Sequence, residues 1–203
     1  TTSQVAALTS NQLVALTTAQ VAALSSDQLV AIETDDLPGM TTSQLRAIAS
    51  DDLAALLTEQ VAALNSTQLA GLLDAQVAAL TTEQLVEIAP SRISALTTSQ
   101  VANLTTDQVV ALTTDQVSAL TTAQVRALTT DQVAAVTTDQ VPALTDAQVA
   151  ALSSTQVQAL TTEQIPLIET NDISAMTSEQ LNALGSAELQ SILSLIHISE
   201  PTR

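Results

Sequence analysis

The chain repeats one eight-residue unit, without insertion or deletion, from Thr1 to Ile192. The unit reads (T/S)(T/S)xQ(V/L)xA(L/I) and occurs 24 times in succession within the 203 residues. A fixed short period is the signature of a repeat architecture, in which each unit contacts only its neighbours in a stack. The period therefore constrains the fold more than any single residue does.

The octad has an apolar side and a polar side when it is placed on a helix. We number it so that the closing aliphatic residue, such as Leu104, is position one and the Thr pair occupies positions two and three. At roughly 100° per residue, positions one, five, six and eight share one side of a helix. Positions one and six are always aliphatic and position eight is mostly Ala, whereas positions four and seven accept almost anything. This split predicts an amphipathic helix.

The helix must break once in every octad. Eight residues advance about 800°, so the apolar stripe of an uninterrupted helix would drift by roughly 80° per octad and face no single partner. The Thr pair supplies the break, because Ser and Thr are good N-caps, and the first Thr with Gln three residues later matches a capping box. Where position two cannot cap, as at Ala49, Leu57 and Leu73, we expect the cap to move one residue onward.

Such short helices are stable only when they are stacked, since isolated helices need roughly 12–15 residues to be marginal in water. We therefore predict an all-α fold over residues 1–192, a solenoid or superhelix of very short capped helices with one helix per octad. The alternative is a β-solenoid with three octads per triangular coil, which Thr and Val would suit. The scarcity of Gly and Asn at corners, and the Ala, Gln and Leu content, favour the helices.

The inward-facing Gln at position five is the most informative polar residue. It occurs in 19 of the 24 octads, the exceptions being Asp36, Asp52, Arg92, Asp172 and Glu188. One interpretation is that this Gln only closes the capping box. The other is that it also bonds a neighbouring repeat and fixes the register, because a buried amide needs partners. The candidate structural residues are Gln100, Gln108, Gln116 and Gln124, with Thr106 and Thr114 of the Thr pairs.

Composition restricts the possible partners. The chain has 21 acidic residues, four Arg and no Lys, for a formal net charge of -17. Such a surface repels nucleic acid and anionic lipid, and no apolar run is long enough for membrane insertion, so we expect neither partner. Zero Cys excludes disulfides and thiolate metal sites. The absence of aromatic residues agrees with a stack of small identical layers.

The sequence offers little chemistry. The single His lies outside the repeats and no base accompanies the many Ser and Thr residues, so we expect no enzyme and no cofactor. The irregular octads bring carboxylates together at Asp35, Asp36, Asp51 and Asp52, which are weak candidate Ca²⁺ ligands. No loop has the glycine spacing of a known Ca²⁺ motif, so polar variation is the favoured interpretation and no metal site is assigned. Pro38, Pro142 and Pro166 occupy outward position seven, where we expect them to bend or tighten the helix.

Three resemblances follow from these residues. The final segment, residues 193–203 with the sequence LSLIHISEPTR, resembles a translated sequencing-library adapter, which implies a non-native tail and a metagenomic fragment truncated at both ends. Segments such as LTTEQLVEI at residues 80–88 resemble the first helix of TAL-effector repeats, without their second helix or base-reading loop. The whole tract is similar to Thr-rich repeats of large bacterial surface and adhesin-like proteins.

The last resemblance implies an extracellular or cell-surface location and a structural role. We expect a rod, stalk or spacer segment of a larger bacterial protein, with self-association possible through the solenoid ends. The alternative is a binding module that holds a peptide, a glycan or Ca²⁺ in the solenoid groove or at the irregular octads, with an unknown protein or glycan partner.

Overall fold

The computed structural model describes residues 1–186 and 189–190. Throughout these residues the chain is helical, with one short helix per octad and no strand, which confirms the predicted all-α solenoid and excludes the β-solenoid. The chain divides into two compact units, unit 1 (Thr1–Leu112) and unit 2 (Thr113–Arg203). The proposed tail at residues 193–203, and Glu188 among the exceptions to Gln, lie outside the described residues.

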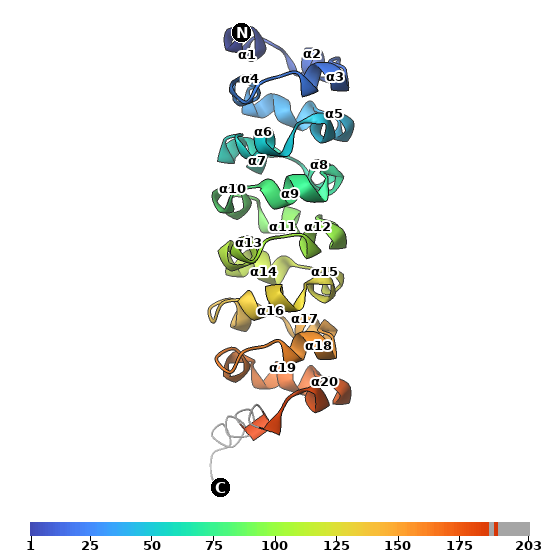
Figure 1. The fold of residues 1–203 in the computed structure, drawn as a ribbon, viewed down its shortest axis with the longest axis vertical. Coiled ribbons are helices and arrows are strands. Elements are labelled where there is room, and N and C mark those ends of the chain that lie inside the picture. The colour runs from blue at the N-terminus through green and yellow to red at the C-terminus, as the bar shows by residue number, and fades with distance from the viewer. Residues whose placement is uncertain (187–188, 191–203) are drawn as a thin grey trace. The chain divides into compact units, whose positions relative to one another are not determined.

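In unit 1 the helices follow one another at intervals of one octad (Figure 1). They are α1 (Thr2–Ala6), α2 (Ser10–Val14), α3 (Thr18–Ala22), α4 (Ser26–Val30), the 3₁₀ helix η1 (Thr34–Gly39), α5 (Thr42–Ala47), α6 (Ser50–Ala54), α7 (Thr58–Ala63), α8 (Ser66–Gly71), α9 (Asp74–Ala79), α10 (Thr82–Val86), α11 (Pro90–Ile93), α12 (Thr98–Ala102) and α13 (Thr106–Ala111).

Unit 2 continues the pattern with both helix types. Its elements are α14 (Thr114–Ala119), α15 (Thr122–Ala127), α16 (Thr130–Ala135), the 3₁₀ helix η2 (Val141–Ala143), α17 (Asp146–Ala151), α18 (Ser154–Gln158), the 3₁₀ helix η3 (Ile165–Leu167), α19 (Thr170–Ala175) and α20 (Ser178–Ala183).

The three 3₁₀ helices confirm the tightening expected at proline. Pro38 lies in η1, Pro142 in η2 and Pro166 in η3. Proline at position seven has no N–H to close the α-helical bond to the carbonyl four residues earlier, so the turn tightens. Pro90 differs because it opens α11 at the first helical position, where the missing N–H has no intrahelical partner to lose.

Most octads begin as the capping box predicts. In α13, for example, the Thr105 Oγ1 accepts the Gln108 N–H at 3.1 Å, and the Gln108 Oε1 accepts the Thr105 N–H at 2.9 Å. The expected shift of the cap is wrong. Ala49, Leu57 and Leu73 remain the N-cap residues of α6, α7 and α9, although they have no side-chain oxygen. The buried positions five and six fix the register, and a shifted cap would rotate them out of the core.

Within each unit, helices three octads apart in the chain stack on one another, so three octads make one superhelical turn. Unit 1 has three columns: the first is α1, α4, α6, α9 and α12; the second is α2, η1, α7, α10 and α13; the third is α3, α5, α8 and α11. In unit 2, α15, α17 and α19 form one column and α16, α18 and α20 another. The octad pattern alone did not predict this number of octads per turn.

The corners between columns are made of extended backbone. At the corner after α14, Leu120 and Thr121 have φ/ψ of −60°/137° and −71°/156°. Any L-residue adopts these angles, and no described residue has a positive φ. The corner therefore needs no Gly, which explains how the whole chain can form so many corners with only three Gly. The aliphatic side chains of positions one and six point inward and form the core.

The position-five amides tie successive turns together. The Gln108 Nε2 donates to the carbonyl oxygens of Val77 at 3.0 Å and Leu80 at 2.8 Å, in and just after α9. Those carbonyls lie at the C-terminal end of a helix in the turn before. The last carbonyls of a helix lack their usual intrahelical donors, and here the amide supplies one, although the Val77 oxygen also accepts the Leu80 N–H at 3.2 Å.

Replacement of Gln108 by Leu tests these cross-turn bonds. We expect Gln108→Leu to lower the free energy of unfolding by about 2–4 kcal/mol, because the Thr105 N–H loses its acceptor and the carbonyls of Val77 and Leu80 each lose a donor. Thr105→Ala in the same octad, which removes only the cap oxygen, should cost about 1 kcal/mol. Urea denaturation followed by circular dichroism measures both. Equal losses for the two variants would show that the cross-turn bonds add nothing.

Candidate functional site

The repeated amide ladder is the most regular polar feature of the molecule. Within the two units the same Nε2 bonds to carbonyls of the preceding turn are made by Gln44, Gln60, Gln68, Gln76, Gln84, Gln100, Gln108, Gln148, Gln156, Gln164 and Gln180. All of these side chains are buried, and no buried side-chain nitrogen or oxygen among the described residues lacks a hydrogen-bond partner. The ladder is therefore saturated and leaves no buried polar atom for a ligand.

The candidate structural residues lie in this ladder or at its edge. Gln100 donates to the carbonyls of Leu69 and Leu72 at 2.9 and 2.8 Å. Gln116 and Gln124 are buried and accept the N–H groups of their N-cap residues, Thr113 and Thr121, at 3.0 and 2.7 Å. Both therefore close capping boxes as Gln108 does.

The two Thr candidates lie just outside the ladder. Thr106 and Thr114 are exposed and are the first helical residues of α13 and α14. The capping oxygens come instead from the preceding residues, Thr105 and Thr113. The second Thr of each pair is therefore a surface position.

The four carboxylates considered as Ca²⁺ ligands lie in separate columns. Asp35 and Asp36 belong to η1 in the second column, and Asp51 and Asp52 to α6 in the first. Asp36 accepts a hydrogen bond from the Ser10 hydroxyl and Asp52 from the Ser26 hydroxyl, each across one superhelical turn. The residues the structure describes contain no group of three or more His, Asp or Glu side chains that could hold a metal ion.

Arg92 occupies position five in place of Gln and takes over the hydrogen-bond donation of the Gln NH₂ group. Its guanidinium donates from Nη1 to the carbonyl oxygens of Ala62 and of Leu64, the latter at 3.2 Å. These carbonyls belong to the preceding turn, as in the Gln ladder. A cationic side chain therefore preserves the link between turns.

An acid at position five cannot donate and bonds differently. Asp36 and Asp52 each accept from a Ser of the turn before, Ser10 and Ser26. At Asp172 the equivalent place is held by Asp146, so two carboxyl groups meet where the other sites pair a carboxylate with a hydroxyl. This pair was not predicted from the sequence, although Asp146 and Asp172 are 26 residues apart, as are Ser10 with Asp36 and Ser26 with Asp52.

The meeting of two carboxyl groups makes Asp172 proton-sensitive. Burial, followed by the hydrogen bond to Asp146, raises the pKa of Asp172 from its ordinary value of 3.8 to about 6. Its side chain is 3% exposed. The folded chain therefore holds a proton on Asp172 that the unfolded chain releases between these two pH values. This group contributes stability below pH 4 and loses that contribution as the pH rises through about 6.

Open depressions lie on the surface of both units. In unit 1 one depression of about 550 Å³ is lined by Met40, Thr41, Thr42, Asn65, Ser66, Thr67 and Gln68. A second, of about 360 Å³, lies on the second column, and a third of about 190 Å³ lies in unit 2 beside α18 and α20. Hydroxyl and amide groups line the largest, without an ionisable side chain to activate them. Among the described helices, none is long and apolar enough to cross a membrane.

Restoring Gln at the acidic position gives a pH-dependent prediction. We expect Asp172→Gln to stabilise the chain more at pH 7 than at pH 4, by at most about 3 kcal/mol, because it removes the cost of ionising a buried acid. Near pH 4 only the pH-independent contribution of the restored cross-turn amide bonds should remain. Urea midpoints of the variant and the parent across pH 4–8 measure the difference, with Asp131→Asn as the exposed control. A pH-independent difference would contradict the assignment.

Substitution of Asp146 gives a second test of the Asp146–Asp172 contact. Asp146→Ser recreates the Ser–Asp arrangement of Ser10 with Asp36, so the pKa of Asp172 should fall. Carboxyl ¹³C NMR titration measures this pKa directly. An unchanged pKa would show that Asp146 does not act on Asp172.

Comparison with known proteins identifies the repeat. The ALTTAQ repeat family matches residues 1–31, 29–66, 93–122 and 114–146, which together cover more than half of the chain. No curated protein matches the sequence. The octads, their capping boxes and the family matches lead to one conclusion: the chain belongs to the ALTTAQ repeat family.

Proposed function

We propose that this chain is a structural repeat segment, a spacer or stalk of a larger bacterial protein at the cell surface or outside the cell. The observation that carries the proposal is the saturated hydrogen-bonding pattern of each octad. A turn of regular octads supplies its own core, caps and cross-turn amide bonds, so such turns can be added without redesign. Length is then set by the number of octads.

The chemistry of the surface also supports a structural role. The outward positions carry mainly Thr, Ser, Ala and acidic residues, and the formal net charge is -17. Like charges keep such a segment soluble and separate from its neighbours. The similarity to Thr-rich tracts of large bacterial surface proteins favours an extracellular location.

Small-angle X-ray scattering tests the spacer. A compact domain of 203 residues would have a radius of gyration of about 17 Å. We expect a value well above this. Duplication of residues 65–88, which are three octads, should lengthen the particle by about 10 Å because packed helices lie 8–10 Å apart. Insertion of a Gly/Ser segment of the same length at the same place is the control, since it adds residues without a stacked turn. A compact particle for the parent chain would refute the spacer.

Self-association through the ends of the stack is a further part of the proposal. Repeat stacks without polar capping units tend to join end to end. We expect sedimentation velocity to show chains that lengthen with protein concentration. A single monomeric species over a hundredfold concentration range would contradict end-to-end association and would leave the spacer proposal intact.

A further inference from the structure

The exposed large apolar side chains are concentrated on the second column of unit 1. Five such side chains occur in the described part of the chain, and four of them belong to this column: Val14 at 41% exposed, Leu57 at 43%, Val86 at 36% and Val110 at 47%. Val14, Val86 and Val110 occupy position seven of octads of the same column, and Leu57 is the N-cap of α7. Stacking therefore aligns the three position-seven Val side chains along one face of the column, whereas Leu57 lies at the start of its helix.

An acidic row runs beside this apolar row. Position four of the same column carries Asp35, Glu59, Glu83 and Asp107, which lie in successive turns and are all exposed or half-exposed. The backbone N–H of Glu83, followed by the Thr81 hydroxyl, lowers the pKa of the Glu83 carboxyl, so it is charged at neutral pH. The column thus presents one apolar and one anionic row along the same direction.

Glu83 of the acidic row and Val86 of the apolar row border one depression. This space of about 360 Å³ spans three successive layers of the column and is lined by Thr58, Thr82, Glu83, Val86, Glu87 and Ala111. Acidic and apolar side chains therefore line one open groove across α7, α10 and α13.

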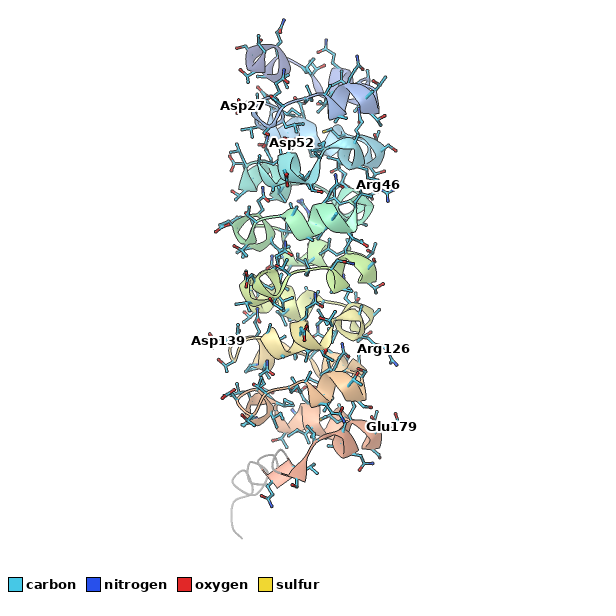
Figure 2. All side chains as sticks on the ribbon, in the orientation of Figure 1. Asp27, Arg46, Asp52, Arg126, Asp139 and Glu179 are labelled. Carbon is cyan, nitrogen blue, oxygen red and sulfur yellow. The ribbon has the colours of Figure 1, made fainter. Side chains whose placement is uncertain are left out.

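The other columns of unit 1 lack this combination. The helices of the third column contain Arg46 and Arg92 and no acidic residue. The first column carries acids such as Asp27, but its position-seven Val30 is only half-exposed, and Leu73 is its one large exposed apolar side chain among the described residues. Figure 2 shows Asp27 and Arg46 at opposite edges of unit 1. Acidic and basic side chains are thus distributed unequally among the three columns of unit 1.

The spacing of the layers restricts the shape of an occupant. Packed helices lie about 8–10 Å apart, so each row offers one side chain per 8–10 Å. Seven residues of an α-helix rise about 10.5 Å and return to nearly the same side. A strand matches this distance with about three residues, which places successive contacts on opposite faces. A helix lying along the column is therefore the better fit.

We propose that the face formed by α7, α10 and α13 binds a basic amphipathic α-helix of another protein, with one heptad per layer. Its apolar side chains contact Val86 and Val110, and its Lys or Arg side chains pair with Glu59, Glu83 and Asp107. Charge selects this occupant, because a second copy of the chain, with its net charge of -17, would bring its own acidic rows against this face, whereas end-to-end stacking keeps the rows apart. The inference does not depend on the spacer role.

A synthetic peptide tests the proposal with the full chain. The peptide has three heptads, with Leu on one stripe, Lys on the adjacent stripe and a single Trp in place of the central Leu. Because the chain contains no aromatic residue, all Trp fluorescence comes from the peptide. We expect saturable binding with a blue shift of the Trp emission, weakened by salt. A peptide with Glu in place of every Lys should not bind.

Matched variants separate this face from general charge attraction. Val86→Ser with Val110→Ser should weaken binding about tenfold. Glu83→Lys with Asp107→Lys should weaken it at least as much. The controls Val30→Ser and Asp27→Lys change the same octad positions on the first column and should leave affinity unchanged, with circular dichroism verifying the fold of each variant. Equal weakening on both columns, or no saturable binding, would overturn the proposal, whereas neither result bears on the length measured by scattering.

Discussion

The side-chain amide at position five is the interaction on which the rest of the structure depends. A helix of five or six residues leaves most of its terminal N–H and C=O groups without intrahelical partners. The Gln side chain provides hydrogen-bond partners at both kinds of helix end. Its oxygen accepts the N-cap N–H of its own helix, and its NH₂ group donates to the last carbonyls of a helix in the turn before. One residue type thus closes the helix start, closes another helix end and sets the distance between turns.

This role explains why the exceptions are informative. Arg92 keeps the donor function and reaches the same class of carbonyls. An acid cannot donate, so Asp36 and Asp52 instead accept from a Ser of the adjacent layer. Asp172 meets another acid and is held partly protonated near neutral pH. The environment at position five is therefore adapted to the amide, and each substitute satisfies it only in part.

Much of the fold could be predicted from the sequence because the determining interactions are local. The capping box links residues three apart, and the apolar positions identify the buried side of each helix, so Thr105 with Gln108 could be assigned from spacing alone. The ladder partners of Gln108 could not, since they depend on the angle through which the extended Leu–Thr corner turns the chain. Three octads per turn, the Asp146–Asp172 contact and the alignment of Val86 with Val110 all follow from that angle. The cap at Leu57 was mispredicted because burial of the neighbouring positions outweighs the loss of one cap oxygen.

Because three octads make one turn, the number of a residue determines the column in which it lies. A residue's direction around the axis of its unit depends on where its octad falls in the cycle of three, since equivalent side chains recur once per turn. Loss or gain of one octad in such a stack would leave every hydrogen bond type in place, yet it would move all later side chains to the adjacent column, a third of a turn away. Only changes by three octads preserve an aligned row. Repeat tracts of this kind can therefore vary in length. Their aligned surface rows survive only when octads are gained or lost in groups of three.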